Sequence, residues 1–136
     1  MWWKTMMVVG LAGILGLAAG CSTKTSDVDL EVTTAPKVTN LLANSHGQTV
    51  LVDVRTASDY AAGHIPGAIN IYILDITEGD PRLADAKTIV VYSSGQDMLS
   101  WAAAKKMLAL GYKNVMDFRG GLAEWKNNGG AVTKGK

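Results

Sequence analysis

Residues 93–98 are the part of this sequence best suited to chemistry. They are Ser93, Ser94, Gly95, Gln96, Asp97 and Met98, and they follow an apolar run at 88–92. The run favours a strand, and the periodic apolar residues between 97 and 110 favour a helix. A loop between a strand and a helix start directs several backbone N–H groups to one point, where the helix dipole adds partial positive charge. This arrangement predicts an anion-binding loop, open to a small anion or to a protein partner.

A reaction at this loop would need a nucleophile, and the loop supplies only the hydroxyls of Ser93 and Ser94. The single cysteine of the chain, Cys21, lies far away in the sequence. A serine nucleophile needs a general base within hydrogen-bond reach, and the base must be oriented by a third group. His64 is the only plausible base, so binding is the favoured interpretation. Asp97 at the helix start would compete with a bound anion for the same amides.

A second polar cluster follows another apolar run, at 49–54. It contains Asp53, Arg55, Asp59, His64 and Gly67. An arginine at the end of a strand can bridge carboxylates with its planar donor fork, and the glycines and proline nearby fix a sharp backbone path. These residues could serve as acid, clamp and base, but we favour a structural role in holding the loop. Too few ligands occur at suitable spacing to predict a metal site, and no cofactor is predicted.

The elements that must position these residues alternate along the chain. Strands are predicted at 28–32, 49–54, 68–71, 89–92 and 114–118, and helices at 36–45, 58–62, 97–110 and 122–128. Strands alternating with helices indicate an α/β fold with a parallel sheet. The strand at 49–54 is apolar on both faces, which suits the centre of a sheet covered by helices. The residues after 128 are predicted to fray.

The N-terminal segment resembles the signal of a bacterial lipoprotein. It has one basic residue, Lys4, followed by an uncharged apolar run at 5–19 that is too short for a comfortable membrane span. Small residues precede Cys21. The resemblance implies that 1–20 is a signal peptide, that Cys21 is lipidated and that 21–27 tethers a domain to the membrane. The protein would then face the periplasm or the extracellular side of the cell envelope; the alternative is an ordinary secretory signal with an incidental cysteine.

Length and charge exclude several other classes of protein. The chain has 136 residues, enough for one domain, predicted at 28–130 with a tail at 131–136. Its 13 basic and 12 acidic side chains nearly cancel, so no nucleic-acid partner is predicted. A single cysteine allows no internal disulfide.

The motifs together resemble the single-domain rhodanese family. The resemblance rests on Asp-x-Arg at 53–55, Gly-His-Ile-Pro-Gly-Ala at 63–68 and Arg-Gly-Gly-x-x-x-Trp at 119–125. It implies an α/β fold with a five-stranded parallel sheet and helices on both faces. It also implies sulfur transfer through a cysteine persulfide in the loop after the fourth strand.

The sequence departs from this family at the reactive position. Ser93 stands where the family has its cysteine, and because the loop is one residue shorter than usual, Ser94 is an alternative alignment. Neither residue supplies the thiolate that sulfur transfer requires. The favoured hypothesis is an anion- or protein-binding module without sulfurtransferase activity. The alternatives are a sulfurtransferase with an atypical loop and a structural envelope protein that binds nothing.

Overall fold

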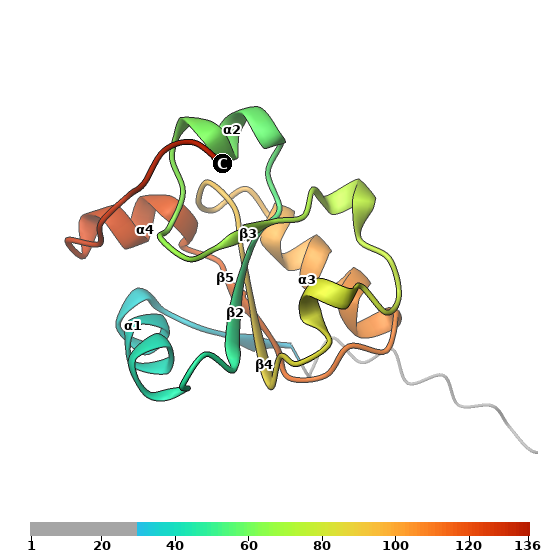
Figure 1. Ribbon diagram of the computed structural model, residues 1–136. Helices are drawn as coiled ribbons and strands as arrows, with labels where there is room; N and C mark the ends of the chain where they lie inside the picture. Colours follow the sequence, from blue (N-terminus) through green and yellow to red (C-terminus); the bar gives the residue numbers. More distant parts are fainter. Residues whose placement is uncertain (1–29) are drawn as a thin grey trace, which may run out of the picture.

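The computed structural model describes residues 30–136, so the predicted signal peptide, Cys21 and the tether lie outside the described residues. Its helices and strands, in chain order, are β1 (Glu31–Val32), α1 (Ala35–Asn44), β2 (Thr49–Asp53), α2 (Ala57–Ala62), β3 (Ile69–Asn70), the 3₁₀ turns η2 (Ile73–Asp75) and η3 (Pro81–Leu83), β4 (Thr88–Tyr92), α3 (Leu99–Ala109), β5 (Val115–Phe118) and α4 (Gly121–Asn127). Figure 1 shows their arrangement.

The strands form one parallel sheet with the order β1-β5-β4-β2-β3. β4 lies at its centre, where Tyr92 is in register with Asp53 of β2 and with Phe118 of β5. The five-stranded parallel sheet predicted from the sequence is therefore confirmed. Because the strands are parallel, their carboxyl ends lie at the same end of the sheet. The loops that follow β2, β4 and β5 meet there.

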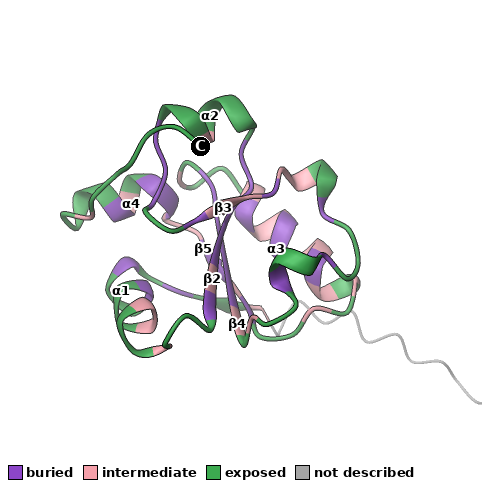
Figure 2. Ribbon diagram, viewed as in Figure 1, coloured by how far each residue is buried: buried purple, intermediate pink, exposed green. Residues whose placement is uncertain are grey.

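Two apolar cores cover the two faces of the sheet. Alternate residues of β4 belong to different cores: Ile89 and Val91 pack with α3, whereas Val90 and Tyr92 pack with α1 and α4. Figure 1 shows α1 and α4 on one side of the sheet and α3 on the other, and Figure 2 shows the central strands buried. Burial on both faces explains why these strands are continuously apolar. Within the described residues 30–136, the two cores contain 11 and 10 buried residues.

The structure corrects two local predictions. The helix predicted from Asp97 begins at Leu99, because Met98 adopts a left-handed conformation with φ of 61°. The tail is docked rather than frayed: the amide of His64 donates to the Thr133 carbonyl oxygen at 2.9 Å, and the Thr133 amide donates back at 3.0 Å. These contacts use backbone groups, which the residue types of the tail do not reveal.

Within residues 30–136 we find no helix of the length and apolar character that crossing a membrane requires.

Candidate functional site

The 93–98 loop leaves the end of β4 and is held in place by α4. The amides of Leu122 and Ala123 donate to the carbonyl oxygens of Ser93 and Ser94, both at 2.9 Å. This close approach requires glycine at position 121, where φ is +54° and a Cβ atom would lie 2.4 Å from the Ser93 carbonyl oxygen. The Gly120–Gly121 pair of the sequence motif thus allows α4 to fix the loop.

Ser93 is fully buried, and its hydroxyl is already engaged. Its Oγ donates to Oδ1 of Asp97 at 2.5 Å, and the same carboxylate oxygen accepts from the amide of Leu99 at 3.1 Å. The carboxylate of Asp97 therefore occupies one hydroxyl and the first amide of α3, as an anion bound at this helix start would. Among the described residues, Ser93 makes no hydrogen bond to His64.

The tip of the loop keeps free hydrogen-bond donors. The Asp97 amide donates to the carbonyl oxygen of Gly95 at 2.8 Å. By contrast, no acceptor within residues 30–136 binds the amides at 94, 95, 96 and 98. The side chains of Ser94 and Met98 are exposed. In this loop one donor position is thus filled by the Asp97 carboxylate, and four backbone amides have no acceptor among the described residues.

A groove of about 410 Å³ lies beside the loop. It is lined by Arg55, Ser94, Leu122, Ala123, Lys126 and Asn127. Among the described residues, neither Lys126 nor the Nη1 of Arg55 has an acceptor. Two positive charges and the Ser94 hydroxyl therefore line a surface next to the loop. The residue pattern does not indicate Lys126, because its place depends on how α4 packs.

Arg55 is a fixed charge rather than a mobile one. Its Nη2 donates to Asp53 Oδ2 at 2.6 Å and to the Gly63 carbonyl oxygen at 2.7 Å. Burial lowers the pKa of Arg55, but the hydrogen bonds and the charge of Asp53 outweigh burial, so the pKa lies above its ordinary value. Asp59 is not a partner in this arrangement: it accepts from the hydroxyl of Thr56 at 2.7 Å. The carboxylate bridge that the sequence suggested is replaced by one carboxylate and one carbonyl group.

A second pair of the same spacing lies on the other side of β4. Asp117 is fully buried and accepts from Arg119 Nε at 3.0 Å and from the Ser100 hydroxyl at 2.6 Å. The strands on both sides of β4 are therefore each followed by an arginine that is anchored by an aspartate two residues earlier. The repeated Asp-x-Arg spacing at 53–55 and 117–119 was visible in the sequence and could have identified this pair.

The remaining residues of the second polar cluster make structural contacts. Nδ1 of His64 lies 2.8 Å from the Tyr60 carbonyl oxygen, and the two rings stack with centroids 3.6 Å apart. Gly67 has φ of +83°, which only glycine adopts readily. The hydroxyl of Tyr92 accepts from the Ile65 amide at 3.1 Å, and burial, followed by the charge of Asp53, raises the pKa of Tyr92. No metal-binding cluster of acidic, histidine or cysteine residues occurs in the described part of the chain.

Comparisons with known proteins agree with this architecture. The family described as the rhodanese-like domain matches residues 34–128. Over 89 residues the chain is 35% identical to the HTH-type transcriptional regulator Rv0324 of Mycobacterium tuberculosis. This match covers 65% of the present chain but only 39% of the regulator. The chain is 35% identical over 79 residues to the thiosulfate sulfurtransferase GlpE of Pseudomonas entomophila, covering 57% of this chain and 71% of that protein.

Among solved structures, the fold is similar to that of the BH2092 protein from Bacillus halodurans. The TM-score is 0.70 and the identity 30%, over 76% of this chain and 77% of the other. The sheet order, the loop after β4 and the sequence match lead to one conclusion: this chain belongs to the rhodanese-like domain family, which includes sulfurtransferases.

Proposed function

We propose that this domain binds an anionic group in the groove beside the 93–98 loop and does not transfer sulfur. The proposal rests on the side chain of Ser93, which has a hydroxyl in place of a thiol. This residue is fully buried, and its Oγ donates to Asp97 Oδ1 at 2.5 Å. Sulfur transfer proceeds through a thiolate that is both nucleophilic and accessible. A buried hydroxyl that already donates to a carboxylate provides neither property.

The charge of Asp97 supports the same proposal. An anionic sulfur donor such as thiosulfate would have to approach a position that already contains a carboxylate, and like charges at this separation repel. The carboxylate also uses the Leu99 amide, at 3.1 Å, which an incoming anion would otherwise bind. The innermost part of the loop is thus unfavourable for a second anion.

The groove outside the loop is favourable for one. Arg55 is held by Asp53, and its Nη1 has no acceptor among the described residues. Lys126 and Ser94 line the same groove. A carboxylate, phosphate or sulfate group could be bound there by a fixed guanidinium, a mobile ammonium and a hydroxyl. The anion could be free in solution or be a side chain of a protein partner.

We also propose that the domain is attached to the cell envelope through lipid on Cys21. Support comes from the uncharged run at 5–19 and the small residues that precede the cysteine. A few buried acyl chains anchor a protein firmly, because each methylene contributes about 0.8 kcal/mol. Replacing Cys21→Ser should move the protein from the membrane fraction to the soluble fraction, and a variant that stays in the membrane fraction would contradict the lipid anchor.

The activity is tested by a thiosulfate:cyanide sulfur-transfer assay on residues 22–136. We expect no turnover above the uncatalysed rate. The names of several relatives favour the second candidate, a sulfurtransferase with an atypical loop. Turnover by the purified domain that is absent from a matched preparation without it would establish that candidate and overturn ours.

Anion binding is tested by titrating the isotope-labelled domain with sulfate and following amide chemical shifts. The expected shifts are at Ser94, Ala123 and Lys126, and Lys126→Gln should weaken binding about threefold to tenfold. Lys87→Gln is the matched control, because that lysine lies at the opposite edge of the sheet. If sulfate binds nowhere in the groove and no acidic peptide binds either, the structural envelope hypothesis takes its place.

A further inference from the structure

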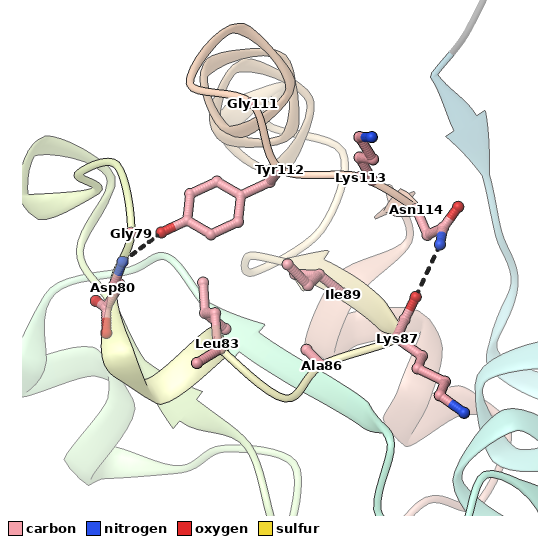
Figure 3. A pocket seen from close by; sticks show the side chains of 11 residues that line it. Gly79, Asp80, Leu83, Ala86, Lys87, Ile89, Gly111, Tyr112, Lys113 and Asn114 are labelled. Atoms are coloured by element: carbon pink, nitrogen blue, oxygen red, sulfur yellow. Dashed lines mark hydrogen bonds between the residues drawn. The ribbon is translucent and has the colours of Figure 1, made fainter.

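A larger cavity than the groove lies at the amino ends of the strands, at the opposite end of the sheet from the 93–98 loop. Its volume is about 520 Å³, and Figure 3 shows it between the segment that contains η3 and the turn from α3 to β5. Ile89, near the start of β4, forms part of its floor. The volume falls in the range of sites that hold small organic molecules. We infer that this cavity binds a small amphipathic anion, with an aryl or short acyl body and one carboxylate or sulfonate group.

The walls of the cavity are fixed by hydrogen bonds between distant parts of the chain. The hydroxyl of Tyr112 accepts from the Asp80 amide and donates to the Thr77 carbonyl oxygen, both at 2.8 Å. At the other end, Asn114 Nδ2 donates to the carbonyl oxygen of Lys87 at 3.0 Å. Figure 3 shows the bonds at the two ends of the cavity. Because both ends are fixed, the cavity is present before a ligand binds, and little ordering is required on binding.

Apolar side chains form the floor and one wall of the cavity. Leu83 and Ile89 belong to the core and, with 4% and 2% of their surface exposed, only touch the cavity, beside the partly exposed Ala86. The ring of Tyr112 forms the facing wall, and its hydroxyl accepts one hydrogen bond and donates another to the chain around it. This floor and wall offer contact to an apolar or aromatic body, while the polar residues of the lining lie at its ends and rim.

The charge at the mouth determines the sign of the ligand. The one acidic residue of the lining, Asp80, is paired with Arg82, and the hydrogen bonds from Arg82 keep the pKa of Asp80 below its ordinary value despite burial. Lys87 and Lys113 are exposed at the rim, and neither has an ion-pair partner within residues 30–136. In Figure 3 both ammonium groups point outward from the cavity, so they meet a head group at the mouth rather than inside. An apolar body below two cations matches an amphipathic anion.

The test uses residues 22–136, which contain both cores, with 4-phenylbutyrate as the probe and amide chemical shifts as the readout. We expect shifts concentrated at 79–89 and 111–114. The double variant Lys87→Gln/Lys113→Gln should weaken binding about tenfold. Ala86→Trp, which fills the cavity, should abolish it. Lys126→Gln, in the groove at the other edge, is the matched control and should leave binding unchanged, so this site and the groove are tested separately.

The charge requirement is tested with 4-phenylbutanol, which has the same body without the carboxylate. It should bind at the same residues about tenfold more weakly than the carboxylate, and the lysine double variant should bind both probes equally. The inference is overturned if 4-phenylbutyrate at about 10 mM causes no shifts at this cavity. Equal binding of the acid and the alcohol to the unaltered domain, or unchanged binding to a folded Ala86→Trp variant, would also overturn it.

Discussion

The contact between Ser93 and Asp97 predicts how a thiol introduced at position 93 would behave. The two side-chain oxygens are 2.5 Å apart, so a thiol in the Ser93→Cys variant would lie beside a carboxylate. A unit charge about 4 Å away disfavours a second negative charge by about 1 kcal/mol in water and about 4 kcal/mol near a protein surface. This corresponds to a thiol pKa raised by about one to three units from about 8.5. Because Asp97 is exposed, solvent screening favours the lower end.

The reactive fraction follows from this shift. At about pH 8, a thiol with a pKa of about 8.5 is about one-quarter thiolate, whereas one with a pKa between about 9.5 and 11.5 is between about 3% and 0.03% thiolate. Ser93→Cys alone should therefore be alkylated slowly. Ser93→Cys/Asp97→Asn, which keeps an acceptor oxygen for the Leu99 amide but removes the charge, should react about ten to a thousand times faster.

The assay is the rate of iodoacetamide alkylation as a function of pH, followed by mass spectrometry, in chains that also carry Cys21→Ser. Thiosulfate:cyanide transfer measured on the same variants should rise in the same order. If both variants titrate with the same midpoint near the ordinary thiol pKa, the carboxylate does not control this position and the electrostatic argument is refuted. A double variant that is fully reactive toward iodoacetamide but silent with thiosulfate would place the defect in donor binding instead.

Three further predictions concern stability and local order. Gly121→Ala should lower the free energy of unfolding in urea by about 2 to 4 kcal/mol, because a Cβ would lie 2.4 Å from the Ser93 carbonyl oxygen. The control Gly129→Ala, with a left-handed φ but nothing within 4 Å of a Cβ, should lower it by about 1 kcal/mol. Equal losses would contradict the close approach at Gly121. The pKa of Asp80 is lowered in the folded state, so its contribution to stability is complete above the unfolded pKa of about 3.9 and is lost as the pH falls through the lower folded value. Asp80→Asn should therefore reduce the loss of folding stability at acid pH, measured by circular dichroism. An unchanged dependence of stability on acid pH would contradict this role of Asp80. Deleting 131–136 should speed hydrogen exchange at the His64 amide, which donates to the tail at 2.9 Å, while exchange in the central strand stays slow.

The sheet could be predicted from the sequence because its signal is local. The apolar runs at 49–54 and 88–92 are buried on both faces in β2 and β4, and runs of this kind suit a central parallel strand. The pairing of Asp53 with Arg55 was also within reach, since two residues of separation at a strand end bring the side chains together. Such predictions need no knowledge of how distant elements pack.

The start of α3 and the groove could not be predicted in this way. Asp97 has the residue type of an N-cap, but its carboxylate accepts from both the Ser93 hydroxyl and the Leu99 amide. Met98 then adopts a left-handed conformation, so the helix begins at Leu99. Lys126 reaches the groove only because Gly121 allows α4 to touch the loop. Both features depend on contacts between elements, which sequence periodicity does not predict.

The identities of residues 93 and 97 are chemically consistent with each other, and this consistency supports a binding role. A serine hydroxyl donates readily to a carboxylate, and the pair at 2.5 Å is a strong, charge-assisted hydrogen bond. A thiolate at the same place would face that carboxylate as a like charge, so a catalytic thiol and Asp97 oppose each other. Serine with aspartate therefore gives a loop that is internally satisfied at its base and still carries free amides at its tip. In such a loop the positions that remain for an outside anion are the tip and the adjoining groove with Arg55 and Lys126, and the sulfate titration examines these positions.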